Sequence, residues 1–134
     1  MWANIETELL NRLPKKTMNG TVRSSTTWAD VAALLNGFQN DYTTDDWDGQ
    51  GATAIPAEVI KSAQALAYAL ATHGTPAPHW TVPTYESSVA FEWNDPDGSS
   101  IEIEVTTPSR VQVTSIRSDK NHERWTVTDG VAAP

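Results

Sequence analysis

The spacing of apolar residues predicts three helices in the first half of the chain. The first apolar set ends at Pro14, because the residue before a proline is steered away from helical angles. The second begins after Thr27, which can cap a helix together with Asp30, and the third runs from Pro56 to Gly74. The apolar positions of the three helices are Trp2, Ile5, Leu9 and Leu13; Trp28, Val31, Leu35 and Phe38; and Val59, Ile60, Ala63, Leu66, Ala67 and Leu70.

From Trp80 onward the apolar period changes to two, which is the period of a strand with one buried face. The turn-forming segments 94–98 and 107–109 are short, so consecutive strands should pair antiparallel. The apolar positions of these strands are Trp80 and Val82; Val89, Phe91 and Trp93; Ile101, Ile103 and Val105; Val111 and Val113; and Trp125 and Val127.

These patterns predict an α+β fold with two N-terminal helices and one central helix packed on a four- or five-stranded antiparallel β-meander. A length of 134 residues suits one domain, 1–134. Within it, we expect residues 1–40 to form a helical N-terminal extension and residues 41–134 to form a loop–helix–meander unit.

The charge is unevenly distributed, which narrows the kinds of partner that the protein can bind. The net charge is −8, and between Ser25 and Ser109 there are twelve acidic residues and a single base, Lys61. A negative field of this kind opposes binding to a phosphate backbone. We therefore expect no direct contact with nucleic acid. The negative surface either keeps the protein soluble or binds a basic partner.

Several classes of site and location are disfavoured by what the sequence lacks. Without cysteine there can be no disulfide, thiolate metal site or cysteine nucleophile. The three histidines, His73, His79 and His122, show no metal-ligand spacing. The start of the chain does not resemble a signal peptide, and no apolar run approaches the ~18 residues of a membrane span. We therefore expect a cytoplasmic protein without cofactor, metal or membrane contact.

The segment 46–52 (Asp-Trp-Asp-Gly-Gln-Gly-Ala) matches two ligand-binding motifs in part. Its Gly49 and Gly51 have the spacing of a dinucleotide fingerprint, but acidic residues precede them and no helix begins within the motif. Asp46 and Asp48 also fit part of a calcium loop. The alignment, however, puts Thr44 and Ile55 at the two positions that require carboxylates. A weak divalent site of another type stays open as an alternative.

We favour a structural interpretation of the same segment. Trp47 is expected to anchor the loop in the core, because it is the one large apolar side chain in a polar, Gly-rich stretch. The Asp48 carboxylate should accept hydrogen bonds from amides of its own loop. Gly49 and Gly51 allow the tight turns that the loop needs.

The segment also resembles part of a group of small uncharacterised bacterial proteins. In that group a Trp-Asp-Gly-x-Gly-Ala segment precedes one helix and a short β-meander. The matching features here are residues 47–52, then Ile55-Pro56, an Ala-rich helix, and a strand with Val89, Phe91, Glu92 and Trp93. The resemblance covers residues 46–114 and supports the fold, and it implies no activity.

Strand alternation predicts an acidic stripe on the solvent side of the meander. If Trp93 faces Ile101 across the turn, Glu92 faces Glu102, and Glu104 lies further along the same side. A catalytic carboxylate pair of the glycosidase type would need aromatic side chains on this side, whereas alternation sends Phe91 and Trp93 to the other. The candidate partner-binding residues are Glu92, Glu102 and Glu104, together with Asp45 and Asp46 of the loop.

Three functional hypotheses follow from different classes. The favoured one is a non-enzymatic interaction module that binds a basic, nucleic-acid-handling protein, as inhibitors and antitoxin-like proteins of phages and mobile elements do. The second is an assembly component that forms homo-oligomers through exposed tryptophans. The third is an enzyme whose site has no recognisable motif.

Overall fold

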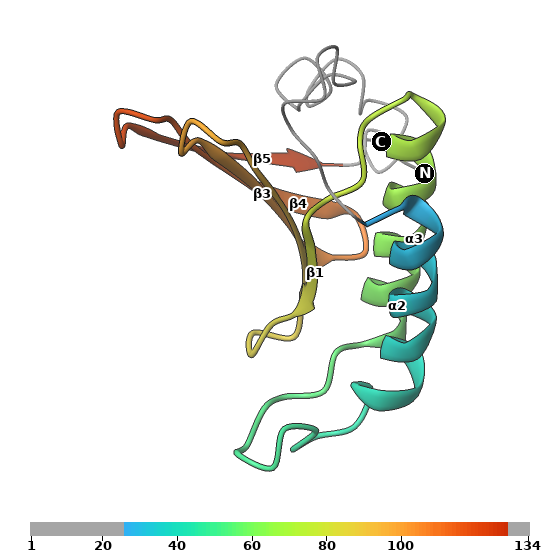
Figure 1. Cartoon of the computed structure of the whole chain (residues 1–134). Coiled ribbons are helices and arrows are strands. Elements are labelled where there is room, and N and C mark those ends of the chain that lie inside the picture. The colour runs from blue at the N-terminus through green and yellow to red at the C-terminus, as the bar shows by residue number, and fades with distance from the viewer. Residues whose placement is uncertain (1–25, 129–134) are drawn as a thin grey trace.

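In the computed structural model, which describes residues 26–128, a five-stranded antiparallel sheet carries two helices on one face (Figure 1). The predicted helix before Pro14 lies outside the described residues. The elements are the helices α2 (Trp28–Asp41) and α3 (Ala57–Thr72) and the strands β1 (Trp80–Pro83), β2 (Val89–Asn94), β3 (Ser100–Thr107), β4 (Arg110–Ile116) and β5 (His122–Thr128).

Both helices have the termini that the sequence indicates. Thr27 and Asp30 form a reciprocal capping box at the start of α2. α3 ends in a Schellman arrangement, in which Gly74 has a φ of 85° and the Thr75 amide donates to the Leu70 carbonyl at 3.0 Å. Pro56 is the N-cap of α3 rather than its first helical residue, so the expected helix start is displaced by one position.

The strands pair in sequence order, β1-β2-β3-β4-β5, which confirms the antiparallel meander. Trp93 lies opposite Ile101 and Glu92 lies opposite Glu102, as the alternation predicts. We call the sheet face that contacts α2 and α3 the inner face, and the opposite side the outer face. Figure 1 shows neither helix on the outer face.

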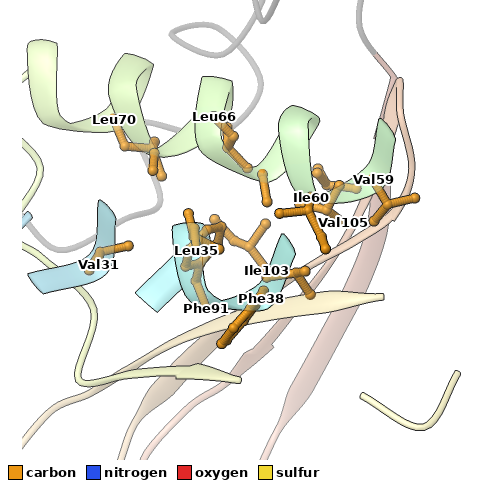
Figure 2. Packing of buried hydrophobic residues seen from close by; sticks show 14 of the residues in the cluster. Val31, Leu35, Phe38, Val59, Ile60, Leu66, Leu70, Phe91, Ile103 and Val105 are labelled. Carbon is orange, nitrogen blue, oxygen red and sulfur yellow. The ribbon is translucent and has the colours of Figure 1, made fainter. Parts of the chain in front are cut away.

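One hydrophobic core joins the two helices to the inner face (Figure 2). Leu35 of α2, Leu66 of α3 and Ile103 of β3 are each fully buried. The fully buried side chains also include Val31, Ile60, Leu70, Val89, Phe91, Val105, Val111 and Val113. Because Val127 of β5 belongs to the same cluster, the core combines residues from both helices and from the strands β2 to β5.

Within the expected N-terminal extension, 1–40, α2 packs against the rest of the described chain. It contributes Val31, Leu35 and Phe38 to the shared core. Its Trp28 indole also donates a 2.7 Å hydrogen bond to the Thr75 carbonyl beyond α3. α2 is needed here because α3 alone is too narrow to cover a five-stranded inner face.

Two neighbouring leucines of α2 provide a matched test of this packing. Leu35 is fully buried, whereas Leu34 is 45% exposed. We expect Leu35→Ala to lower the free energy of unfolding by about 2–5 kcal/mol, as truncations in a packed core do. Leu34→Ala should change it by no more than about 0.5 kcal/mol. Urea unfolding of both variants measures the difference, and equal effects would contradict the placement of α2 in the core.

Candidate functional site

The strand register gathers the three candidate glutamates on the outer face. One row of paired residues crosses all five strands, and the next row along lies beside it. The first row is Trp80, Glu92, Glu102, Thr114 and Arg124, and the second is Val82, Ala90, Glu104, Gln112 and Thr126. We call Glu92, Glu102 and Glu104 the glutamate group. The same face carries Gln112, Thr114, Arg124 and Thr126.

The glutamates differ in exposure, which corrects the picture of a uniformly exposed stripe. Glu102 is exposed, whereas Glu92 and Glu104 are half-buried. The neighbouring Ala90 is only 3% exposed although it points to the outer face. Side chains therefore pack closely over the β1 side of this face, and they leave Glu102 as the most accessible carboxylate of the group.

A short chain of hydroxyl groups holds Glu104 in place. The Ser88 hydroxyl donates to a Glu104 carboxylate oxygen, and it is also hydrogen-bonded to the Thr84 hydroxyl. Ser88 is 1% exposed, so this contact is shielded from water. The Thr84 amide closes the same turn by donating to the Ser88 carbonyl at 2.9 Å. The turn between β1 and β2 thus fixes the direction of one carboxylate of the group.

The main electrostatic effect on the outer face is a raised pKa of Glu102. Partial desolvation raises its pKa above the ordinary 4.5, and the negative charges of Glu104 and Glu92 raise it further. Arg124, in the same row, opposes this shift. Arg124 also donates from Nε to the Thr114 hydroxyl at 3.3 Å, which places its charge along the row of the outer face. The face is acidic at its centre and basic at the β5 edge.

The Gly-rich loop uses its carboxylates to organise its own backbone. Oδ1 of Asp48 accepts from the amides of Gln50 at 2.8 Å and Ala52 at 3.0 Å, as expected. Asp46 accepts from the Gly51 amide at 2.6 Å, and Asp45 accepts from the Ala54 amide at 2.9 Å. Each of the three aspartates therefore uses at least one carboxylate oxygen to accept a hydrogen bond from a backbone amide of the loop.

Backbone angles explain the glycines of this loop. Gly49 and Gly51 have φ values of 73° and 89°, where a side chain would be strained. Asp46 adopts a positive φ of 64°, which aspartate tolerates better than most residues. The tight turns expected at the two glycines are confirmed.

Trp47 does not occupy the core, contrary to expectation. It is half-buried, its ring meets Tyr42 edge-on at 4.7 Å between centroids, and its indole donates to the Thr53 carbonyl at 3.0 Å. Its other face stacks on Tyr85 of the β1–β2 turn, with centroids 5.9 Å apart and planes within 4°. Figure 1 shows why: the loop lies beyond the ends of α2 and α3, on the side of that turn.

The part of the chain that the structure describes contains no group of three or more His, Asp or Glu side chains placed to hold a metal ion. Nor is either of its helices long and apolar enough to cross a membrane. What the outer face offers is a set of fixed negative charges beside exposed apolar side chains, which suits recognition of a cation.

Sequence reasoning missed two features of this face. The apolar period places Trp80 and Val82 on a strand but does not indicate which sheet face they occupy. The register places both on the outer face. Continuing the alternation of inner and outer positions from β2 back through the turn at 84–88 predicts the same face. The Ser88–Glu104 contact had no sequence signal, because it depends on how the turn folds over the face.

No protein-family model, curated protein or solved structure matches this chain. The functional argument therefore depends on the arrangement of its own residues.

Replacing Asp48 tests the loop. We expect Asp48→Ala to reduce the protection of the Gln50 and Ala52 amides in hydrogen exchange, and Asp48→Asn, which keeps an acceptor oxygen, to retain part of it. The two amide hydrogen bonds lower the pKa of Asp48 below 3.8, so the stabilisation by its charged form is present above that pH. It should be lost as the pH falls through the lowered value. Unchanged protection in Asp48→Ala at pH 7 would contradict this role.

Removing the charge of Glu102 tests whether repulsion within the glutamate group destabilises the fold. Because its pKa is raised on folding, the native state binds more protons than the unfolded state above pH 4.5, and stability falls as the pH rises through that window. Glu102→Gln should therefore raise the free energy of unfolding at pH 7, by about 0.2–1 kcal/mol on the scale of cross-strand pairs. The gain should vanish near pH 3. Glu58→Gln, at an exposed position of α3, serves as the control and should show no such gain.

Proposed function

We propose that this protein is a non-enzymatic interaction module whose outer sheet face binds a basic segment of a partner protein. The observation that supports this most directly is the placement of Glu92, Glu102 and Glu104 on one sheet face that neither α2 nor α3 covers. Burial raises the pKa of Glu102, and the negative charges of Glu104 and Glu92 raise it further. A basic partner would reduce the repulsion among the three carboxylates, and this reduction would contribute to the free energy of binding.

The spacing of the glutamates defines what a partner must present. Glu102 and Glu104 are two residues apart on β3, which corresponds to about 6.6–6.8 Å along a strand. Glu92 lies across from Glu102 on the adjacent strand, roughly 5 Å away at Cβ. Lysine or arginine side chains at positions i and i+4 of a helix, or i and i+2 of an extended segment, match these separations.

The class of partner follows from its charge. Surfaces with clustered lysine and arginine side chains are typical of proteins that bind phosphate backbones. We therefore propose a nucleic-acid-handling protein as the partner, and an inhibitor-like or antitoxin-like action in which the glutamate group occupies part of its basic surface. The analogy is with small acidic proteins of phages and mobile elements, which often act as inhibitors or antitoxin-like partners. It would operate in the bacterial cytoplasm, where the absence of cysteine is no disadvantage.

Binding of a defined basic peptide tests this proposal. The probe is a nine-residue peptide that alternates lysine with alanine, titrated into the ¹⁵N-labelled protein at low and high salt. We expect amide shifts centred on β2 and β3 and an affinity that falls as salt screens the charges. The double variant Glu92→Gln/Glu102→Gln should weaken binding about threefold to tenfold, because exposed ion pairs are worth up to ~1 kcal/mol each.

A charge-matched control separates a local contact from the effect of net charge. Asp41→Asn/Glu58→Gln removes the same charge from two exposed residues on the helices, at the end of α2 and the start of α3. Its affinity for the peptide should stay within about twofold of the unmodified protein. Equal weakening by both double variants, or shifts that map to the helices, would contradict binding at the outer face.

A further inference from the structure

An exposed tryptophan stands at the end of the acidic row. Trp80 is 59% exposed, whereas the other tryptophans among residues 26–128 are half-buried or buried. Val82, two residues on and on the same face, is 40% exposed. Exposed tryptophans are rare on surfaces that meet only water and are enriched where proteins bind one another. The β1 edge of the outer face therefore offers an apolar contact beside its charges.

The register puts this indole next to the carboxylates. Trp80 is the direct cross-strand partner of Glu92, which in turn lies opposite Glu102. Side chains in such antiparallel pairs are about 5 Å apart at Cβ, so an aromatic ring and a carboxylate can contact one bound group together. An aromatic face and a carboxylate at this spacing are complementary to a flat cation.

We propose that the outer face recognises arginine in its partner, with the guanidinium stacked on the Trp80 ring and its N–H groups donating to Glu92. This inference rests on the proposed function and specifies the residue that is bound. Guanidinium is planar, stacks on aromatic rings and donates in a fork that fits a carboxylate. A lysine ammonium is a compact, strongly hydrated charge and gains less from the same two groups.

Charge argues against other occupants of this face. A second copy of the chain would bring two glutamate groups together, and repulsion within one group already raises the pKa of Glu102. Anionic lipid and nucleic acid would meet the same repulsion. A neutral apolar segment would cover Trp80 and Val82, but it would remove water from Glu92 without providing a donor.

Two peptides that differ only in their cation test the inference. Nine-residue peptides alternating arginine or lysine with alanine are titrated into the full chain, and the Trp80 indole N–H resonance is followed by NMR. The unmodified protein should bind the arginine peptide about twofold to fivefold more tightly, which is the range of exposed cation–π contacts. The indole resonance should move with the arginine peptide more than with the lysine peptide.

Substitutions identify the source of this preference. Trp80→Leu keeps an apolar side chain without an aromatic face, so it should bind the two peptides about equally. Tyr68→Ala removes another exposed aromatic ring, 77% exposed on α3, and should leave the preference unchanged. Persistence of the preference in Trp80→Leu would overturn the role of the ring.

The remaining outcomes separate this inference from the function on which it rests. Equal, salt-dependent binding of both peptides to the unmodified protein would overturn arginine recognition and leave the acidic interaction face standing. Absence of binding by either peptide would overturn both. Light scattering supplies a third result: a dimer that Trp80→Ala dissociates would show that a second copy occupies the face, which would also overturn the inference.

Discussion

The burial of the inner sheet face against α2 and α3 determines where the charged side chains of the strands lie. Phe91 and Ile103 are fully buried, and Trp93 is 2% exposed with its indole bonded to the Pro76 carbonyl at 2.8 Å. Because strand side chains alternate, a slip of one residue would bring these groups into water and turn Glu92 and Glu102 toward the core. The hydrophobic core therefore holds the glutamates on the outer face.

The relative sizes of two effects explain why the fold tolerates like charges on facing strands. Burying a side chain such as Phe91 or Ile103 contributes about 1.5–3 kcal/mol, and the core contains many such residues. Opposed like charges cost about 0.2–1 kcal/mol. The register is thus set by the core, and the repulsion between Glu92 and Glu102 remains as a small cost in the free protein. The cationic partner that we propose would remove that cost, so the feature that weakens the isolated sheet would favour its binding.

Local sequence signals were sufficient for the helices and strands of residues 26–128 and for the register between β2 and β3, whereas the number of strands stayed at four or five. The capping box at Thr27, the left-handed Gly74 and the pairing of Trp93 with Ile101 each depend on residues close together in sequence. The place of α2 in the core and the half-burial of Trp47 depend on how distant segments pack, and alternation carries no information about that. For the candidate site, the shared face of the glutamates was predictable, whereas their unequal exposure was not. Glu104, for example, is half-buried beside Ser88, and their contact forms only when the turn folds back.

The Gly-rich loop and the acidic face, which the sequence presents as separate features, are joined through the β1–β2 turn. Trp47 stacks on Tyr85, and Tyr85 follows Thr84, whose hydroxyl bonds to Ser88 beside Glu104. Rigid stacking at one end of the turn limits the positions open to the hydroxyls at the other. Because Asp45 and Asp46 already accept hydrogen bonds from their own loop, the loop's contribution is better explained as support for the turn than as direct contact. In this arrangement the loop positions the turn and the turn orients Glu104 on the outer face, which is the face that we propose binds a partner.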